Sequence, residues 1–273
     1  MPELPEAETI ARELNRRLSG NKFGPVTLSR TDIVHGDARP LGELLPGRRV
    51  CRVWRRAKRV VLDLDDGTLL VFRLGMTGQL MLVDSNSPSN LHTHLRIAVP
   101  DLGCELRFRD PRRFGGLWCL TGGDQTAGKP LGEVGPEPLE ITRATFRRIL
   151  QRRRQMKALL MDQHIIAGLG NIYCDEALHA AGIHPLTRAN MLDAATADRL
   201  LRAIKRVLRK AIRFNGSTLM DYRQADGTEG SFQKHHRVYQ REGEPCRTCG
   251  TRLRRIRCAG RSTFLCPKCQ QRR

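Results

Sequence analysis

Apolar residues recur with helical spacing close to the N-terminus. The positions on this stripe are Ala7, Ile10, Ala11, Leu14 and Leu18. Pro5 precedes the stripe and Gly20 follows it, which is typical of the first turn and the end of a helix. The pattern predicts one amphipathic helix at the start of the chain.

The pattern changes to that of strands from about Val50 to Leu120. The runs RVVLDL and TLLVFRL flank Asp65-Asp66-Gly67, and the runs LRIAV and CELRF flank residues 100–103. Apolar runs of this length on either side of a short turn predict two hairpins. The first part of the chain is therefore expected to be two packed antiparallel sheets that carry the N-terminal helix.

Helical spacing dominates after residues 122–140, which are rich in Gly and Pro and predict a linker. Phe146, Ile149 and Leu150 share one helical face, and apolar segments follow at 158–161 and 172–181. A longer amphipathic helix is predicted over 194–214. Residues 215–234 are polar and turn-rich, which indicates a mobile loop.

The charge balance indicates the kind of partner that the protein binds. Lys and Arg number 48 against 28 Asp and Glu, a formal net charge of +20. Such an excess favours a polyanion, with nucleic acid first and an anionic membrane second, over an ordinary basic surface. No apolar run is long enough to span a bilayer, and the start MPELPEAETI is unlike a signal peptide. An intracellular protein is expected.

Four of the nine cysteines form two CxxC pairs near the C-terminus. Cys246 and Cys249 are separated by 16 residues from Cys266 and Cys269. Two such pairs complete a tetrahedral four-thiolate zinc site, with one structural ion and no open coordination position. Cys258, between the pairs, is not expected to be a ligand.

The segment between the cysteine pairs carries five arginines. They are Arg252, Arg254, Arg255, Arg257 and Arg261. A hairpin too small for its own core, stabilised by metal and covered with arginine, is suited to binding phosphates. The alternative is a solvated charged hairpin.

Pro2 offers a second kind of chemistry. If the initiator methionine is removed, Pro2 presents a secondary amine with a pKa of roughly 7.7–8.0, partly unprotonated near neutral pH. Such an amine can attack an aldehydic or acetal carbon, and Glu3 beside it can exchange a proton. Taken alone, Pro2 is more often only compatible with methionine removal.

The combination of motifs resembles the bacterial formamidopyrimidine-DNA glycosylases, also called 8-oxoguanine DNA glycosylases. The blocks that carry the resemblance, in chain order, are MPELPEAETI, RRAK, LGMTG, DPRRFGG, LGEVGPEPL, LMD, GLGNIYCDEAL, AAGIHP and the closing cysteine pairs. They span nearly the whole chain. The resemblance implies an α+β protein with a β-sandwich, a helix–two-turn–helix domain and a zinc finger.

The resemblance also implies a division of the chain. The expected parts are a catalytic domain at 1–121, the linker at 122–140, a DNA-binding domain at 141–235 whose loop 215–234 caps the lesion, and a zinc finger at 236–273.

Catalytic roles follow from the resemblance residue by residue. Pro2 is expected to attack the sugar C1′ of the damaged nucleotide. Glu3 is expected to donate or accept the proton of the sugar or the departing base. Lys58, the lysine of RRAK, is the expected acid of the first elimination. Arg261 is expected to contact phosphate and to serve the second elimination.

Further residues match the DNA contacts of the family. Met76, Arg112 and Phe114 correspond to the trio that fills the space of the flipped-out base, a step that the chemistry requires. The remaining expected DNA contacts are His92, Arg112, Arg152, Lys157 and Asn171. Arg73 departs from the family, in which His commonly stands before LGM, and this puts one phosphate contact in doubt.

The sequence thus predicts a monomeric DNA glycosylase and AP lyase. It would act on oxidised purines in double-stranded DNA in the cytoplasm, where DNA would associate it with the nucleoid. Two alternatives keep the scaffold: a non-catalytic damage-binding protein, and an enzyme for oxidised pyrimidines like endonuclease VIII. A zinc-ribbon ribosomal or transcription accessory protein would explain the charge and the cysteines but not the N-terminal blocks.

Overall fold

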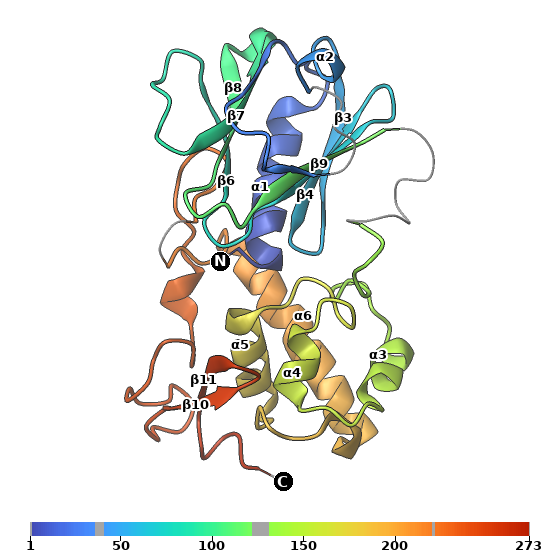
Figure 1. The fold of residues 1–273 in the computed structure, drawn as a ribbon. Helices are drawn as coiled ribbons and strands as arrows, with labels where there is room; N and C mark the ends of the chain where they lie inside the picture. The colour runs from blue at the N-terminus through green and yellow to red at the C-terminus, as the bar shows by residue number, and fades with distance from the viewer. Residues whose placement is uncertain (1, 36–40, 122–130, 220–221, 273) are drawn as a thin grey trace. The chain divides into compact units, whose positions relative to one another are not determined.

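The computed structural model describes residues 2–35, 41–121, 131–219 and 222–272. Contacts divide the chain into two compact units (Figure 1), the first comprising Met1–Glu133 and Phe214–Ser231, the second Val134–Arg213 and Phe232–Arg273. Most of the segment 215–234, expected within the helical domain, thus clusters with the first unit. Residues 122–130 of the expected linker lie outside the described residues.

Within its described residues, the first unit contains one helix of four turns, a short helix and two sheets. Its elements are α1 (Leu4–Leu18), β1 (Val26–Leu28), β2 (Val34–His35), α2 (Leu41–Leu44), β3 (Val50–Arg56), β4 (Arg59–Leu64), β5 (Leu69–Arg73), β6 (Gln79–Asp84), β7 (Thr93–Val99), the 3-10 turn Pro100–Leu102, β8 (Cys104–Arg109) and β9 (Gly116–Leu120). The strand orders are β2-β9-β5-β4-β3 and β1-β7-β8-β6.

Both predicted hairpins are present, as β4–β5 and β7–β8. The sandwich is not wholly antiparallel, because β2 pairs in parallel with β9. One apolar core takes side chains from both sheets and from α1, and α1 packs against β3 and β4. The five-stranded sheet is also covered on its other face, where Leu131 packs on Val61 and Val71. This second cover explains why the β4 run is apolar at successive positions.

The segment 214–231 contributes to the first unit through its described residues. Tyr222 and Ala225 join the apolar core, and the carbonyl of Ala225 accepts a hydrogen bond of 2.8 Å from the backbone N–H of Leu82 in β6. The segment therefore covers part of a sheet edge. Residues 220–221 of the expected lesion-capping loop lie outside the described residues.

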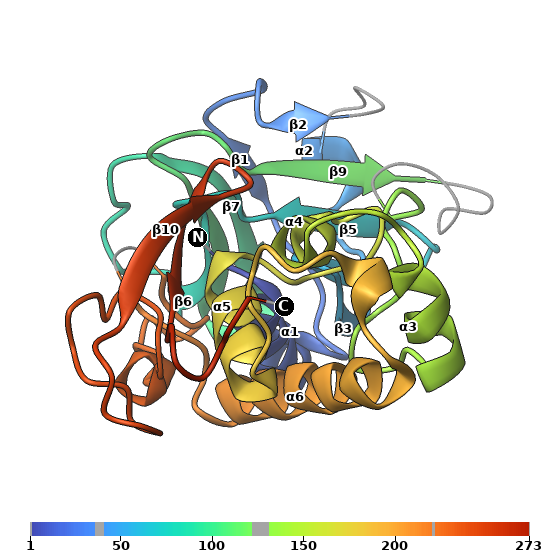
Figure 2. The ribbon, with the colours of Figure 1, turned by 90° about the horizontal axis from the view of Figure 1, so that it is seen from below.

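The second unit is helical and ends in a small hairpin. Its elements are α3 (Arg143–Leu150), α4 (Met156–Met161), α5 (Asn171–Ala181), the 3-10 turn Ala189–Met191, α6 (Ala194–Arg213), the 3-10 turn Phe232–His235, β10 (Arg254–Cys258) and β11 (Arg261–Leu265). α5 and α6 pack side by side (Figure 2). Among the described residues, no helix has both the length and the apolar character needed to cross a membrane.

Local capping accounts for the helix ends. The Thr142 hydroxyl accepts from the backbone N–H of Thr145 at the start of α3, and the Asp193 carboxylate accepts from that of Thr196 at the start of α6. α5 ends at Gly182, which has a φ of 65°. Only a residue without a Cβ adopts this left-handed conformation at little cost.

Candidate functional site

Pro2 and Glu3 lie immediately before α1, and both are buried. The backbone N–H of Glu3 donates to the Glu6 carboxylate at 2.9 Å, and Pro5 stands in the first turn. Helix capping therefore fixes the direction in which the chain enters α1. The predicted nucleophile Pro2 and its neighbouring acid Glu3 are thus held at the start of a rigid helix.

Lys58 lies in the two-residue turn between β3 and β4. Its neighbour Ala57 has a φ of 54°, a conformation that a residue with a Cβ adopts at a cost. Arg55 stabilises the turn, because its Nη1 donates to the carbonyl of Ala57 at 3.0 Å. The Nε of Arg55 in turn donates to Glu8 of α1 at 2.7 Å. The helix that begins after Glu3 thus also orients the Lys58 turn.

The Glu8–Arg55 pair is largely shielded from water, with side chains 18% and 6% exposed. Burial disfavours the charged carboxylate, but hydrogen bonding and the charge of Arg55 outweigh it, so the pKa of Glu8 lies below its usual 4.5. Arg12 binds the same carboxylate from a position that is 66% exposed. Of the two arginines, Arg55 is the structural partner.

We expect Glu8→Gln to lower the unfolding free energy of the first unit by roughly 1–3 kcal/mol near neutral pH, because a charge-assisted hydrogen bond is lost. Since the folded-state pKa is lowered, the stabilisation is complete above the usual 4.5 and fades as the pH falls below it. Trp54 and Trp118, the two tryptophans of the chain, both lie in this unit. Denaturant unfolding followed by tryptophan fluorescence therefore measures the effect.

Arg12→Ala is the matched control for Glu8→Gln. It removes only the exposed partner and should cost less than about 1 kcal/mol. An equal loss in both variants, or a Glu8→Gln effect unchanged at pH 3, would contradict the assignment of the Glu8–Arg55 pair as the support of the turn.

Three arginines form a row across the ends of strands β3, β4 and β5, next to the Lys58 turn. Arg56 pairs in register with Arg59, and Arg59 with Arg73. Burial, followed by the charges of Arg73 and Arg56, lowers the pKa of Arg59. Arg73 is exposed and stands over the ring of Trp118 at 5.4 Å. These strand ends beside Lys58 therefore concentrate positive charge, which suits a polyanion.

The structure brings the predicted void-filling trio together. Met76 and Phe114 are among the exposed large apolar side chains, at 39% and 55%. Nη1 of Arg112 lies 3.8 Å from the sulfur of Met76, and its guanidinium carbon lies 5.8 Å from the Phe114 ring centroid. Two apolar side chains in water beside a cation are typical of a surface that inserts into a partner.

Asp110 joins the two loops that carry this trio. It is fully buried, and its carboxylate accepts from the Thr77 hydroxyl at 2.5 Å and from the backbone N–H of Gly115 at 2.7 Å. A Cβ on Gly75 would lie 2.5 Å from the backbone nitrogen of Gly115. The close approach of the loops therefore requires glycine at position 75. The Asp110 carboxylate is the hydrogen-bond acceptor that joins the two loops.

His92 is linked to the same loops. Its carbonyl accepts from the backbone N–H of Asp110 at 3.1 Å, and the carbonyl of Asp110 lies 2.9 Å from Nε2 of His94. His92 is exposed and has a φ of 68°. This predicted DNA contact therefore belongs to the same loop cluster as the trio.

The segment 214–231 reaches the N-terminal residues through Glu6. The Glu6 carboxylate, which accepts from Glu3, also accepts from the backbone N–H of Ser217 at 2.8 Å. A Cβ on Gly216 would lie 2.7 Å from the same carboxylate. Burial, followed by the charge of Glu6, raises the pKa of Tyr222, which therefore remains a neutral phenol. The expected lesion-capping segment is thus anchored beside Glu3.

In the second unit, Asn171 is the first residue of α5, after Gly168 and Gly170. Gly168 has a φ of 80°, and its N–H donates to Gln163 Oε1 at 2.9 Å. Gln163 also donates to the carbonyl of Leu169 at 2.7 Å. This turn presents the N-terminus of α5, and such an end attracts phosphate.

A buried ion pair ties α5 to the hairpin. Lys157 and Asp175 are both fully buried and 2.7 Å apart. The Lys157 ammonium also donates to the Thr263 hydroxyl at 2.7 Å and to the carbonyl of Ser262 at 3.3 Å, and Asp175 accepts from the backbone N–H of Phe264 at 2.9 Å. The three donors of Lys157 are thereby used within the protein. Its direct contact with DNA stays a prediction, and its burial favours an indirect role.

Arg261 and Asn171 belong to one surface. The Asn171 amide donates to the carbonyl of Ser262 at 3.0 Å, which places the exposed Arg261 next to the start of α5. Ala259 and Gly260, with φ of 51° and 72°, form the turn that precedes Arg261. Arg152 is exposed, and within the described residues no hydrogen bond or ion pair connects it to this group.

The four predicted zinc ligands converge. Their sulfur atoms all lie within 4.8 Å of one another, and the separations include 3.4 Å for Cys249–Cys266 and 4.0 Å for Cys246–Cys269. Tetrahedral zinc with Zn–S distances of about 2.3 Å requires sulfur separations of roughly 3.8 Å. The donor set therefore fits one structural Zn²⁺. Cys258 lies outside the cluster and faces Gln155.

Sequence reasoning missed several residues that position the site. Glu8, Arg55, Asp110 and Asp175 carry no chemistry that a spacing rule detects, because their partners are distant in the chain. Among the residues that position the site, only Glu6 has a local sequence signal. It stands three residues after Glu3, which is the spacing of a capping box.

Family models match three consecutive regions of the chain. They describe the formamidopyrimidine-DNA glycosylase N-terminal domain at residues 1–117, the H2TH domain of the same glycosylase at 134–223, and a zinc finger found in FPG and IleRS at 243–272.

Full-length relatives and solved structures agree with these matches. A formamidopyrimidine-DNA glycosylase from Herpetosiphon aurantiacus is 45% identical and covers 99% of this chain and 100% of its own. The crystal structure of a MutM (Fpg) protein from Thermus thermophilus is 41% identical, with a TM-score of 0.88 and complete coverage of both chains. A Lactococcus lactis Fpg in complex with abasic-site DNA is 34% identical, with a TM-score of 0.91 over 99% of this chain and 100% of its own. The chain therefore belongs to the formamidopyrimidine-DNA glycosylase family.

Proposed function

We propose that this protein removes oxidised purines, including 8-oxoguanine and formamidopyrimidines, from duplex DNA and then cleaves the strand at the abasic site. The family assignment supports this activity, since relatives carry the glycosylase name and are solved on Fapy-dG and abasic DNA. One observation carries it to this chain: Pro2 and Glu3 precede the helix that also fixes the Lys58 turn.

The proposed reaction begins at Pro2 once Met1, which lies outside the described residues, has been removed. The Pro2 nitrogen bonds to the sugar C1′ as the bond from C1′ to the base breaks, and the base departs with a proton. Glu3 exchanges the proton of the sugar or of the departing base. The C1′–O4′ bond then breaks as O4′ takes up a proton, which opens the sugar and leaves an iminium between Pro2 and C1′ that withdraws electrons from C2′.

Strand cleavage follows from this iminium. Loss of a C2′ proton expels the 3′ phosphate, and Lys58 serves as the acid of this first elimination. A second elimination removes the C4′ proton and expels the 5′ phosphate, with Arg261 contacting a phosphate. Hydrolysis of the iminium then frees Pro2 and releases the remnant of the sugar as an unsaturated aldehyde. The product is a one-nucleotide gap with phosphate at both ends.

DNA binding is assigned to two surfaces, one in each unit. In the first, the arginine row beside Lys58 supports phosphate binding, His92 adds a contact, and Met76, Arg112 and Phe114 fill the space left by the flipped base. In the second, Asn171 and Arg261 hold phosphate at the start of α5, with Arg152 as a further contact. Lys157 positions the hairpin through Ser262 and Thr263.

The zinc finger supplies no reactive ligand position. Four thiolates complete the coordination of Zn²⁺, which stabilises the module that presents Arg261. The expected parts 1–121, 122–140, 141–235 and 236–273 belong to this proposal, as do a monomeric state and a cytoplasmic, nucleoid-associated location.

The function is tested with three duplexes that carry 8-oxoguanine opposite cytosine, a formamidopyrimidine, or thymine glycol. We expect cleavage of the two purine lesions with phosphate at both ends of the gap. Preferential cleavage of thymine glycol would support the endonuclease VIII-like alternative. Tight binding of all three without cleavage would support the non-catalytic alternative.

Asp110→Asn should reduce excision of 8-oxoguanine by roughly tenfold, because an amide cannot accept from both Thr77 and Gly115 and the void-filling loops lose their register. Cleavage of a duplex with a ready-made abasic site should fall much less, since an abasic nucleotide is easier to extrude. Single-turnover rates on the two duplexes give the comparison.

Arg113→Ala is the control for Asp110→Asn. Arg113 lies in the same loop and is exposed, and its contact with Asp32 is a 3.4 Å surface pair. Its rates should remain within about twofold of the parent protein. Equal losses on both substrates in Asp110→Asn would indicate general damage to the fold and would refute the assigned role.

A further inference from the structure

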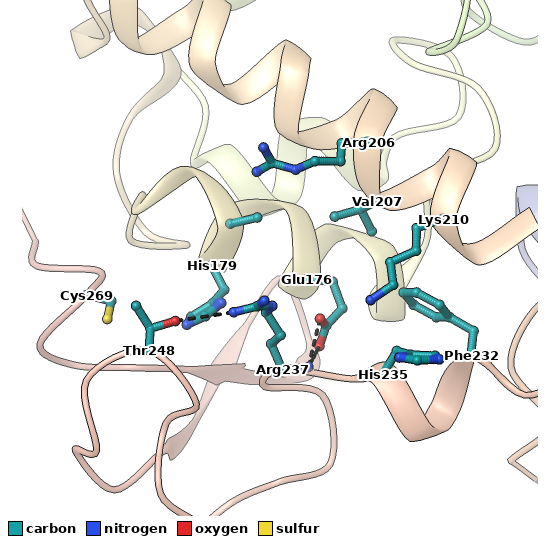
Figure 3. A pocket seen from close by; sticks show the side chains of 11 residues that line it. Glu176, His179, Arg206, Val207, Lys210, Phe232, His235, Arg237, Thr248 and Cys269 are labelled. Carbon is teal, nitrogen blue, oxygen red and sulfur yellow. Dashed lines mark hydrogen bonds between the residues drawn. The ribbon is translucent and has the colours of Figure 1, made fainter. Parts of the chain in front are cut away.

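A cavity of about 410 Å³ lies within the second unit. Its walls are formed by α5, α6, the segment 232–237 and the zinc finger, as Figure 3 shows. None of the residues assigned above to DNA or to catalysis lines it. A volume in the range of roughly 300–1,000 Å³ is typical of small-molecule sites.

Positive charge surrounds the cavity. Arg206 and Lys210 reach it from α6, and Arg237 and His235 from the segment 232–237 (Figure 3). Within the described part of the chain, Arg206 makes no hydrogen bond or ion pair. Burial, followed by the charge of Lys210 and other cations, lowers the pKa of His235. The arrangement favours an anion.

The single carboxylate on the wall, that of Glu176, has a structural task. Glu176 is 2% exposed and accepts from the backbone N–H groups of Arg237, Val238 and Tyr239 at 2.9–3.0 Å. It therefore holds the segment that presents Arg237 to the cavity.

The remaining walls are not those of a plain phosphate site. Ala180, Val207 and Phe232 supply apolar surface. His179 is 6% exposed, its Nε2 lies 3.5 Å from Cys246 Sγ, and its Nδ1 is buried without a hydrogen-bond partner among the described residues.

We propose that this cavity binds a nucleotide. The phosphate group is held by Arg206, Lys210 and Arg237, because guanidinium and ammonium groups match phosphate oxygens. The planar base lies against Val207 and Phe232. A free mononucleotide and a nucleotide of a DNA strand share this chemistry.

The test uses the full-length, zinc-loaded protein and a fluorescent mononucleotide, 1,N6-etheno-AMP, at low salt. Fluorescence anisotropy should show saturable binding. Arg206→Ala should weaken it at least about tenfold, because a charge-assisted contact to phosphate is lost. Arg209→Ala is the matched control, since Arg209 is exposed on the same helix but does not line the cavity, and should change binding less than about twofold.

Competition distinguishes the two sources of nucleotide. If undamaged duplex displaces the probe and Arg206→Ala also weakens duplex binding, the ligand is part of a DNA strand; if neither occurs, it is a free nucleotide. Equal weakening by Arg206→Ala and Arg209→Ala, or the absence of saturation at millimolar probe, overturns the proposal. Displacement by an oligoglutamate peptide at lower concentrations than AMP does so too.

Lesion cleavage is measured on the same samples at saturating protein, where weaker duplex binding does not limit the rate, and Arg206→Ala is expected to leave it unchanged. Normal cleavage without nucleotide binding would refute only the nucleotide site. Nucleotide binding without cleavage would refute only the proposed glycosylase and lyase activity.

Discussion

Pro2→Gly should slow excision and strand cleavage by roughly 10²–10⁴-fold while leaving affinity for lesion DNA within about twofold. The variant keeps an N-terminal amine, but a primary amine on a flexible residue replaces the buried, ring-constrained nitrogen before α1. Borohydride trapping followed by peptide mapping measures the covalent adduct. In the parent protein the trapped sugar should be attached to Pro2.

Pro5→Ala is the matched control, because it changes the other proline at the start of the same helix. It should form the adduct at Pro2 at close to the parent rate. An adduct on a lysine, full activity of protein that retains Met1, or loss of DNA affinity in Pro2→Gly would each contradict the role of Pro2 as nucleophile.

Loss of zinc should lower the affinity for duplex DNA by at least about 100-fold. The zinc finger has a small core, in which Leu253 and Phe264 pack beside the cysteines, so the metal supplies much of its folding free energy. Without it, Arg261 is no longer held beside Asn171. Cys249→Ser and chelator treatment, each with measured zinc content, are read out by anisotropy of labelled duplex over a range of salt concentrations.

Cys258→Ser is the control for the zinc experiment. Cys258 is buried in the same hairpin but faces Gln155 instead of the metal cluster. It should retain one zinc per chain and nearly the parent affinity. Full affinity in a verified metal-free sample would exclude a role of the finger in DNA binding.

The sequence predicted the elements whose patterns are long. α1, α3, α5 and α6 and the hairpins β4–β5 and β7–β8 follow from periodicity and turn residues, and the zinc cluster follows from cysteine spacing. The strands β1 and β2 were missed, because three and two residues are too short for an alternating pattern to appear. The parallel β2–β9 pair depends on a contact between distant segments.

The residues that position the site escaped prediction for a related reason. Glu8 and Arg55 are 47 residues apart, and Asp110 and Thr77 are 33 apart. An acid in an amphipathic helix is ordinarily a solvent-facing residue, and only the fold shows which acid meets a partner. The resemblance to a family identified the residues expected to react. The residues that position them could be identified only from the three-dimensional structure.

The buried Lys157–Asp175 pair limits how this protein can be re-engineered. Because the hairpin supplies two acceptors to Lys157 and one donor to Asp175, a chimera that received a foreign finger would leave buried polar groups of this ion pair without hydrogen bonds, at a cost of several kcal/mol. Grafting would succeed only if both positions were exchanged together with the finger. Helix α5 and the metal module thus form one structural unit.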